Sequence, residues 1–510
     1  MKKRALISVY DKEGIVDFAT SLSKLGWEII STGGTSKILK EAGIEILEVE
    51  EITNFPEMLD GRVKTLNPYI HGGLLYKRDN ENHVKKVEEM GIDPIDIVVN
   101  NLYPFEETVM REGVSHDEVI ENIDIGGPSM IRAAAKNYMH VSVVVDPKDY
   151  DLIIEELSNV GKVSEETNKY LAAKVFNYTA YYDALIAKYF NDLSGVQFPE
   201  TLTLTYKKEQ SLRYGENPHQ AAAFYREFGD VNGTLAAGKQ LHGKELSFNN
   251  INDSNGAIRA LKEFDEPTIV AVKHSNPCGI GSGKTLEEAY IKAYECDKVS
   301  IFGGIIAANR IIEKEVAEMI NSIFIEVVLA PGYSDEAIEI LTQKKNIRLI
   351  QIDDIGKEIN ELDTKKVFGG LLIQERDSIL LLEDMEIATK RVPTEKELED
   401  LIFAWKAAKN INSNGIVLAR DKATIGIGLG EVNRIWAVEE AIQRGMEKIE
   451  GSVLASDGFF PFKDSIEVLA QNGVKAVIQP GGSIRDQEVI EEADKNGIAM
   501  IFTRIRHFKH

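Results

Sequence analysis

The chain has 510 residues, more than one hydrophobic core usually serves, so two or three domains are expected. Lys and Arg number 59 against 82 Asp and Glu, and the resulting net charge of −23 argues against broad binding to nucleic acid or anionic membrane, which both need a positive surface. With 43% hydrophobic and 28% charged residues, the composition is that of an ordinary globular protein.

The two cysteines, Cys278 and Cys296, form no C-x-x-C pair, and so few thiols in a long chain indicate a reducing compartment. The basic start, MKKR, is followed by no sustained apolar segment, and no run of eighteen apolar residues occurs in the sequence. We therefore expect a cytoplasmic protein whose partners are neither membranes nor nucleic acids.

The first part of the chain alternates short apolar runs with helical patterns. Strands are expected in RALISVY, WEIIST, IDIVVNNLYPF and HVSVVVDP, and helices in KEGIVDFATSLSKLG, TSKILKEAG, 148–160 and 165–193. This alternation predicts a doubly wound parallel sheet that is covered on both faces. The stretch SGVQFPETLTL follows the last of these helices, and we expect a domain boundary there, near residue 198.

Polar residues and glycines gather where these elements meet. Residues 32–35, TGGT, lie between a strand and a helix, where backbone N–H groups and hydroxyls can hold a phosphate, although an ordinary strand–helix turn explains them as well. Arg62 and Lys64 lie two residues apart, so an extended segment would point both to one side.

Further candidates stand at strand and helix ends. Asn101 and Tyr103 end a strand, a position at which open α/β folds place their sites. Asp124 precedes a Gly-Gly turn into a helix, and Lys136 lies at the far end of that helix. Asp124 and Lys136 can therefore meet only if the fold or a ligand brings them together.

The remainder of the chain shows a weak internal duplication. Four segments recur in similar form and in the same order: SFNNINDSNG, TIVAVKH, FGGIIAAN and EVVLAPG are followed later by KNINSNG, GIVLAR, SVLASDGFF and AVIQPGG. Two similar α/β subdomains explain the echoes, and chance reuse of such words is the alternative.

The stretch TIVAVKHSNPCGIGSGKT, residues 268–285, brings Lys273 and His274 side by side after a strand. It is not a good triphosphate loop, because Cys278 stands where G-x-x-x-x-G-K-[ST] needs its first glycine. It also lacks the second cysteine of a zinc deaminase. An acid–base pair remains, with a histidine that can accept a proton from an amine and a lysine that can stabilise developing charge. A satisfied buried histidine and a solvated lysine are the plain alternative.

Ten motifs in order carry a resemblance to a known family: ALISVYDKEG, STGGT, GRVKTLNPYIHGG, NLYPF, IDIGGPSMIRAAAKN, LRYGENPHQ, VKHSNPCG, FGGIIAANR, SNGIVLA and SDGFFPF. Along essentially its whole length the sequence resembles the bifunctional purine biosynthesis enzymes, which combine AICAR transformylase with IMP cyclohydrolase. The resemblance implies a methylglyoxal-synthase-like cyclohydrolase domain over 1–197. It also implies a transformylase domain over 198–510, built from two cytidine-deaminase-like α/β subdomains of roughly 198–375 and 376–510.

The resemblance also implies site residues. For ring closure the implied catalytic residues are Lys64, Tyr103, Asp124 and Lys136. For formyl transfer they are Lys273 and His274. Substrate contacts are implied for Tyr10, Lys12, Thr32, Gly34, Thr35, Arg62, Thr65, Asn101, Gly126, Gly127, Arg213, Tyr214, Asn250, Phe302, Gly303, Glu326, Asn414, Arg434, Phe459, Arg506 and His510. The chain end, TRIRHFKH, would be an ordered strand that closes the nucleotide site.

The expected partners are AICAR, formyl-AICAR, IMP and reduced folate, with 10-formyltetrahydrofolate as co-substrate and no catalytic metal. A homodimer with a shared transformylase site is implied, and a structural potassium ion stays an open alternative. Two other functions compete: a P-loop ATPase that uses GSGKT, and a non-catalytic nucleotide-binding protein of the same fold.

Overall fold

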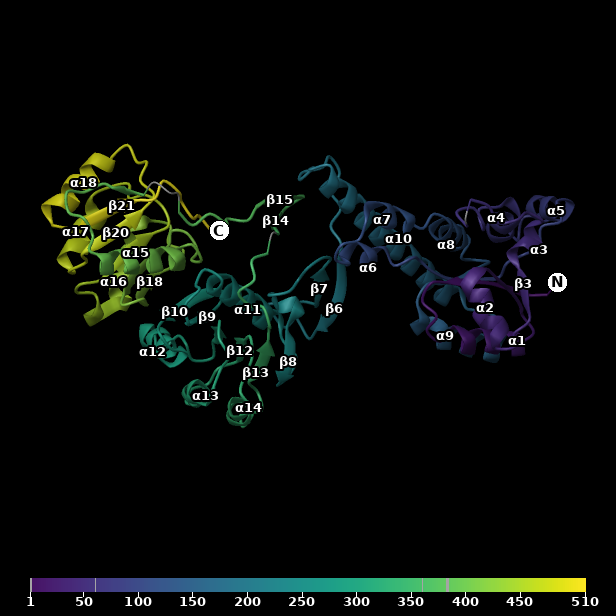
Figure 1. Cartoon of the computed structure of the whole chain (residues 1–510), viewed down its shortest axis with the longest axis horizontal. Helices are drawn as coiled ribbons and strands as arrows, with labels where there is room; N and C mark the ends of the chain where they lie inside the picture. The colour runs from purple at the N-terminus through teal and green to yellow at the C-terminus, as the bar shows by residue number, and fades with distance from the viewer. Residues whose placement is uncertain (1, 60, 360, 382–384) are drawn as a thin grey trace. The chain divides into compact units, whose positions relative to one another are not determined.

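The structure is a computed structural model that describes residues 2–59, 61–359, 361–381 and 385–510. It divides into two compact units, Met1–Tyr206 and Lys207–His510, and each is considered by itself (Figure 1). No helix among the residues described has the length and apolar character that a membrane span requires.

The N-terminal unit is built on a five-stranded sheet with the order β3-β2-β1-β4-β5, and every pairing in it is parallel. The predicted parallel sheet and its strand–helix alternation are confirmed. The elements are β1 (Arg4–Val9), α1 (Ile15–Lys24), β2 (Glu28–Ser31), α2 (Gly33–Glu41), β3 (Ile46–Glu48), α3 (Val49–Thr53), α4 (Pro68–Leu75), α5 (Glu81–Glu89), β4 (Ile97–Asn101), α6 (Phe105–Met110), α7 (His116–Glu121), α8 (Gly126–Lys136), β5 (Ser142–Val144), α9 (Tyr150–Val160) and α10 (Glu165–Leu193).

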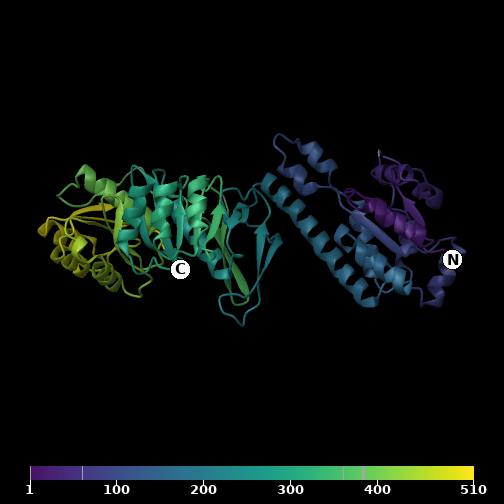
Figure 2. The ribbon, with the colours of Figure 1, turned by 90° about the horizontal axis from the view of Figure 1, so that it is seen from below.

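Apolar side chains cover both faces of this sheet, as the continuous apolar runs of its strands predict. One core joins Ala5, Ile7 and Val9 of β1 to the apolar faces of α1 and α9. Helix α8 contacts β4 and β5, and the long helix α10 contacts α8 and β5 and also contributes Leu171 to the core of α1 and α9 (Figure 2). The strand ends therefore remain the exposed edge at which polar groups can gather.

The C-terminal unit contains a twelve-stranded sheet with the order β16-β21-β20-β19-β17-β18-β10-β9-β11-β12-β13-β8. Its elements are β8 (Lys239–His242), α11 (Phe248–Leu261), β9 (Thr268–Lys273), β10 (Asn276–Ser282), α12 (Leu286–Cys296), β11 (Ile305–Ala308), α13 (Lys314–Asn321), β12 (Val327–Ala330), α14 (Asp335–Leu341), β13 (Arg348–Gln351), β16 (Glu386–Ile387), α15 (Glu395–Ala408), β17 (Ile416–Arg420), β18 (Ala423–Gly428), α16 (Arg434–Gly445), β19 (Val453–Ser456), α17 (Asp464–Gln471), β20 (Ala476–Gln479), α18 (Asp486–Lys495) and β21 (Ala499–Phe502). Two small ribbons, β6 (Tyr206–Leu212) with β7 (Ala222–Glu227) and β14 (Leu362–Val367) with β15 (Gly370–Glu375), complete the unit.

The twelve strands form two halves of the same design. From the central β10–β18 pair outward, the order β10-β9-β11-β12-β13-β8 is repeated by β18-β17-β19-β20-β21-β16. The expected pair of α/β halves is present. One of the sequence echoes is wrong, however, because NINDSNG lies inside α11 whereas NINSNG lies in the loop after α15. The true counterpart of α11 is α15, whose sequence shows no such words.

The packing of helices on the sheet is also the same in the two halves. One core on one sheet face contains residues of both α11 and α15, while α12–α14 and α16–α18 cover separate cores on the other face. In each half a strand glycine admits the backbone of a helix. A Cβ on Gly279 would lie 2.1 Å from the carbonyl oxygen of Ala293, and one on Gly426 would lie 2.1 Å from that of Ala441.

The chain end differs from the sequence expectation. Strand β21 ends at Phe502, and residues 503–510 form no strand. They are nevertheless held by hydrogen bonds: Ser413 N donates to Lys509 O (2.8 Å), and His507 N donates to Asp457 O (3.0 Å). The two arginines of TRIRHFKH interrupt the apolar pattern of β21, so the sheet stops there and the tail runs on as an irregular segment.

Candidate active sites

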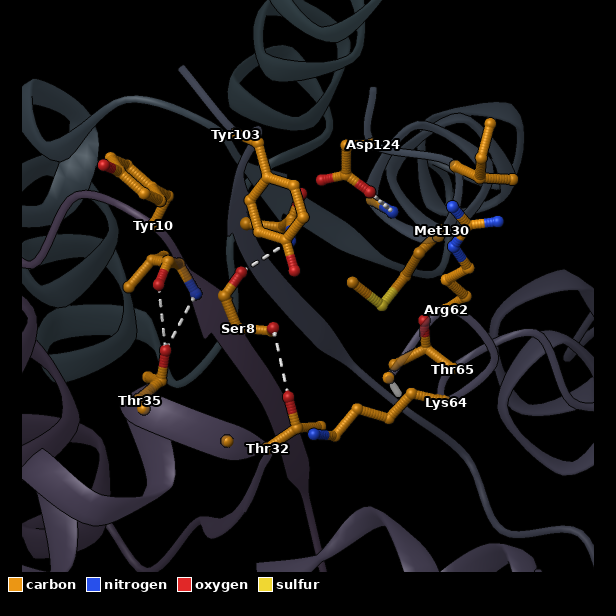
Figure 3. A pocket seen from close by; sticks show the side chains of 18 of the residues that line it. Ser8, Tyr10, Thr32, Thr35, Arg62, Lys64, Thr65, Tyr103, Asp124 and Met130 are labelled. Carbon is orange, nitrogen blue, oxygen red and sulfur yellow. Dashed lines mark hydrogen bonds between the residues drawn. The ribbon is translucent and has the colours of Figure 1, made fainter. Parts of the chain in front are cut away.

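A cavity of about 710 Å³ lies at the carboxyl ends of β1, β2 and β4 in the N-terminal unit. This is the edge at which parallel sheets place ligands. The helices α2 and α8 begin at the cavity, so their N–H groups and positive dipole ends face it. The predicted residues that line it are Tyr10, Lys12, Thr32, Gly34, Thr35, Arg62, Lys64, Thr65, Asn101, Tyr103, Asp124, Gly126 and Gly127 (Figure 3).

The start of α2 is shaped for a close backbone approach. Gly33 has a φ of 53°, a conformation that glycine adopts at little cost, and a Cβ at Gly34 would meet nothing within 4 Å. Thr35 is occupied internally, since its hydroxyl accepts from Val9 N (3.1 Å) and donates to Val9 O (3.0 Å). Lys64 Nζ lies 3.4 Å from the position of a Cβ on Gly33, so a cation stands beside the helix N-terminus.

Two of the cavity's cations are paired with carboxylates. Lys64 forms an ion pair with Glu57, and Arg62 forms one with Glu121. Both carboxylates line the cavity, and neither was predicted as a site residue. No sequence signal links them to the cations, because Glu57 precedes Lys64 in an irregular loop and Glu121 ends a different helix.

Asp124 is the carboxyl group most enclosed by the site. Burial raises its pKa, and backbone N–H groups, including that of Gly127 at 2.8 Å from Oδ1, oppose that rise. A Cβ at Gly127 would lie 2.4 Å from Asp124 Oδ2, so only glycine fits there. Burial also raises the pKa of the Tyr103 phenol, and the charges of Asp124 and Glu57 add to the effect. In Figure 3, Tyr103 and Asp124 face Thr32 and Lys64 across the cavity.

Two further polar residues, Ser8 and Asn100, line the cavity and were not predicted. Asn100 Nδ2 donates to Ser8 O (2.5 Å), while its buried Oδ1 has no hydrogen-bond partner among the described residues. A buried acceptor of this kind is available to an N–H or O–H of a ligand. The signal was present in the sequence, since both residues are polar positions at the ends of apolar strands, as is Asn101.

Lys136 is the one predicted ring-closure residue that does not line the cavity. It is exposed at the last position of α8, whereas Gly126 and Gly127 at the start of that helix belong to the site. Ten residues of helix separate the two ends by about 15 Å.

In the C-terminal unit, Lys273 and His274 lie where β9 turns into β10. The two strands pair antiparallel, and the turn residues His274 and Ser275 have φ values of 53° and 61°. His274 is exposed, and Lys273 Nζ donates to Phe302 O (2.9 Å). The predicted strand end is correct, but the glycine-rich stretch after it is strand β10, paired with β9 and β18, and not a loop. The ATPase alternative is therefore not favoured, because a phosphate loop needs free backbone N–H groups.

Contacts connect Lys273 with further predicted residues. Phe302 lies beside Gly303, and the chain continues through Gly304, whose carbonyl oxygen accepts from Glu326 N (3.0 Å). Glu326 Oε2 in turn accepts from Asn250 Nδ2 (2.8 Å) at the start of α11. The structure thus brings together Lys273, His274, Asn250, Phe302, Gly303 and Glu326.

A second group gathers around the chain end. Arg434 is buried and donates to Ser456 Oγ (3.2 Å), forms an ion pair with Asp457, and lies against Gly458. Asn414 Nδ2 donates to Glu431 O (2.7 Å), and Phe459 is exposed. In the tail, the guanidinium of Arg506 lies 4.6 Å from the ring centroid of Phe508, which also contacts His510. Arg213 lies elsewhere, exposed after β6, with its guanidinium 5.6 Å from the ring centroid of Tyr214.

No group of three His, Cys, Asp or Glu side chains that could hold a metal ion occurs within the described ranges. Cys278 is buried in β10, and burial raises the pKa of its thiol to about 12, so it is not a reactive thiolate.

Comparison with known families defines the class of protein. A family model described as "MGS-like domain" matches residues 14–129, which include much of the sheet and the cavity. A second model, described as "AICARFT/IMPCHase bienzyme", matches residues 134–444. The chain is therefore an α/β enzyme that joins an MGS-like domain to a transformylase region.

Full-length relatives make the assignment specific. Proteins named "Bifunctional purine biosynthesis protein PurH" from a Thermoanaerobacter species, Acetivibrio thermocellus and Ruminiclostridium cellulolyticum are 58%, 57% and 56% identical, over 100% of this chain and 100% of each relative. A solved structure titled "Crystal structure of ForH" is 36% identical over 37% of this chain and 100% of its own, with a TM-score of 0.34. The chain belongs to the AICARFT/IMPCHase bienzyme family. It is a bifunctional enzyme of purine biosynthesis, with AICAR formyltransferase and IMP cyclohydrolase activities.

Proposed function

We propose that the two activities belong to the two units, with ring closure in the N-terminal cavity and formyl transfer at the β9–β10 turn. The observation that carries the proposal is the cavity itself. It unites a carboxyl group of raised pKa, a phenol and an ammonium beside two helix N-termini. Such a set supplies a base, a hydrogen-bond donor and an anion site within one enclosure.

In ring closure, a nitrogen of formyl-AICAR attacks the formyl carbon and water leaves. Asp124 would orient that nitrogen and take its proton, and its raised pKa makes it a better base than an ordinary aspartate. Lys64 polarises the formyl oxygen as charge develops there, and Tyr103 donates a hydrogen bond to the same region. A C–N bond forms, and the formyl oxygen leaves as water with the protons that these groups return.

The nucleotide phosphate would lie at the start of α2, held by the backbone N–H groups of Gly34 and Thr35 and by the side chains of Thr32, Arg62 and Thr65. Tyr10, Lys12, Asn101, Gly126 and Gly127 complete the contacts. Lys136 has a role through the resemblance alone, and its position outside the cavity gives that role no support.

In formyl transfer, His274 takes a proton from the 5-amino group of AICAR as that nitrogen attacks the formyl carbon of 10-formyltetrahydrofolate. Lys273 stabilises the oxyanion and then protonates the departing folate nitrogen, so formyl-AICAR and tetrahydrofolate result. The exposed ring of His274 supports this assignment, as do the hydrogen bonds of Lys273 to Phe302 and of Asn250 to Glu326. Arg213, Tyr214, Asn414, Arg434, Phe459, Arg506 and His510 are proposed nucleotide and folate contacts.

The finer points of the proposal rest on the resemblance. They are the folate co-substrate, a homodimer that shares the transformylase site, and a cytoplasmic location. Ring closure and transfer as written need no catalytic metal, and a structural potassium ion is left open.

The test is IMP formation by the purified chain from AICAR and 10-formyltetrahydrofolate, without ATP or added metal. We expect IMP and tetrahydrofolate in equal amounts. Formyl-AICAR without IMP would refute the assignment of the N-terminal cavity. Absence of any product from folded protein would refute the formyl donor, and would favour a non-catalytic nucleotide-binding protein.

A further inference from the structure

The turn that carries His274 is held in a conformation that its residues do not favour. His274 and Ser275 both have positive φ, in a two-residue connection between antiparallel strands. Asn-Gly and Asp-Gly are the usual residues there, because a Cβ is unfavourable in the left-handed region. Neither turn residue is a glycine, so the surrounding structure must hold the turn.

The carboxylate of Asp253, on the adjacent helix α11, binds both turn residues. Its Oδ2 accepts from His274 N (3.1 Å), and its Oδ1 accepts from Ser275 N (2.8 Å) and from Ser275 Oγ (3.0 Å). Gly256, one turn further along α11, leaves room for the turn, since a Cβ there would lie 3.1 Å from Ser275 O.

Helix α11, which carries Asp253, packs against strand β9 through a buried core. Ala257, Ile258, Ala260 and Leu261 of α11 are buried in the same core as Val270 and Val272 of β9. The helix that carries Asp253 is thus fixed to the strand that carries Lys273. The backbone of α11 at Asp253 therefore cannot shift relative to β9 without disturbing that core.

The second half of the unit contains the same arrangement, an aspartate on a helix that binds a left-handed turn, but without the Lys-His pair. Asp400 on α15 accepts from Asp421 N (2.9 Å) and Lys422 N (2.7 Å), and both turn residues have a φ of 55°. The carboxylate that binds two left-handed residues therefore belongs to the duplicated scaffold. In the second half the turn side chains pair with other charges: Asp421 with Lys396, and Lys422 with Glu266. In the first half the His274 ring makes no hydrogen bond to any described residue.

We propose that Asp253 is a positioning residue for formyl transfer, which locks the left-handed turn and so holds His274 beside Lys273. This inference rests on the proposed role of His274. It makes Asp253 necessary for the geometry of the reacting groups and not for the chemistry itself.

The test compares Asp253→Asn with Asp400→Asn in the full-length chain. Asparagine keeps the shape but places an NH₂ group against one of the two backbone donors, so one hydrogen bond is lost and two donors face each other. Formyl-transfer kcat, the KM for AICAR, its pH profile, ring closure and the melting temperature are measured for both variants.

We expect Asp253→Asn to lower the kcat of formyl transfer by about 100-fold, the loss that a displacement of about 1 Å causes. KM and the shape of the pH profile should change little, because His274 remains the base. Asp400→Asn should leave kcat within about threefold, even if both variants melt at the same lower temperature. Adding Ser275→Gly to Asp253→Asn should restore part of kcat, because glycine favours the left-handed turn. If Asp253→Asn alone does not fold, the double variant takes its place in the comparison with Asp400→Asn.

Equal losses of kcat in the two single variants would overturn the inference, since they would indicate a general effect on the scaffold. Full activity of Asp253→Asn would also overturn it. His274→Ala, assayed beside them, separates this failure from that of the proposed function. If His274→Ala keeps formyl transfer, the proposed function is wrong. If it loses transfer while Asp253→Asn does not, only the role of Asp253 is wrong.

Discussion

The two candidate sites are built in different ways. In the N-terminal unit, side chains from the ends of several parallel strands meet in one cavity beside two helix starts. In the C-terminal unit the proposed reacting pair comes from a single hairpin turn, in one of two halves that share the same strand order. The first kind of site follows from the topology of a parallel sheet. In the second, the duplicated scaffold supplies the turn, and the residues on it determine whether it is a site.

The largest expected effect removes the reacting group of the hairpin site. His274→Ala should lower formyl transfer by about 10⁴-fold, because it deletes the proposed general base. Ring closure of supplied formyl-AICAR should continue in the same sample, since the N-terminal cavity is untouched. Both rates are measured from absorbance changes on the separate substrates.

Asp421→Ala is the matched control, because Asp421 holds the corresponding turn position in the second half. It should leave both activities within about threefold, an ordinary effect for a surface substitution. A loss of formyl transfer as large as that of His274→Ala would show that the two halves are not functionally distinct.

The reciprocal change removes Asp124, the proposed base of the cavity site. Asp124→Asn should lower ring closure by about 10³-fold while formyl transfer continues, so the variant should accumulate formyl-AICAR. Asparagine preserves the size of the group next to Gly127, which limits the structural effect. Product analysis by chromatography measures the accumulation, and loss of both activities from folded protein would contradict the division between the units.

The difference between the two sites also explains how much of each could be predicted from the sequence. Strand ends in a parallel sheet meet at one edge, so Thr32 and Tyr103 could be expected together. Arg62 and Lys64 both line the cavity, but they lie in a segment of turns and bends and not in the extended segment from which they were predicted. Asp124 lies between two helices, so strand order alone does not place it there. The ion-pair partners Glu57 and Glu121 could not be predicted, because their contacts depend on the path of a loop and on a different helix.

Less of the C-terminal site followed from local patterns. The strand before Lys273 was predicted, but the words NINDSNG and NINSNG suggested an equivalence that the fold does not have. The real equivalence joins Asp253 to Asp400, which follow the capping residues Ser247 and Thr394 of their helices at the same distance but have different neighbouring residues. It depends on a contact between helix and turn, which periodicity does not reveal.

A pH profile sharpens the comparison at Asp124. Because burial raises the pKa of this carboxyl, kcat/KM for ring closure should fall on acidification at a pH above the ordinary aspartate value of about 3.9. The acid limb should disappear in Asp124→Asn. An acid limb that persists in this variant would assign the base to another group.

The raised pKa of Asp124 also affects the stability of the fold, and its effect on stability depends on pH in the opposite sense from its effect on catalysis. The folded state binds the Asp124 proton more tightly than the unfolded state does, so this group favours folding at low pH. That contribution is lost as pH rises from the unfolded-state value through the raised folded-state pKa. The N-terminal unit should therefore gain resistance to acid unfolding that Asp124→Asn removes, measured as the pH dependence of the urea midpoint.

The smallest effect concerns the carboxylates that neutralise the cavity's cations. If the nucleotide phosphate binds as proposed, it must compete with Glu57 for Lys64 and with Glu121 for Arg62. Lys64 and Glu57 are 24% and 36% exposed, whereas Arg62 and Glu121 are 64% and 58% exposed, so water screens the second pair more strongly.

Glu57→Gln should then tighten IMP binding by about fivefold at low salt, and Glu121→Gln should tighten it less. Calorimetry with IMP at two salt concentrations measures both changes, and the difference should shrink at high salt because screening weakens both ion pairs. Weaker binding by Glu57→Gln would mean that this carboxylate contacts the nucleotide, and that the cavity uses it for recognition and not only for charge balance.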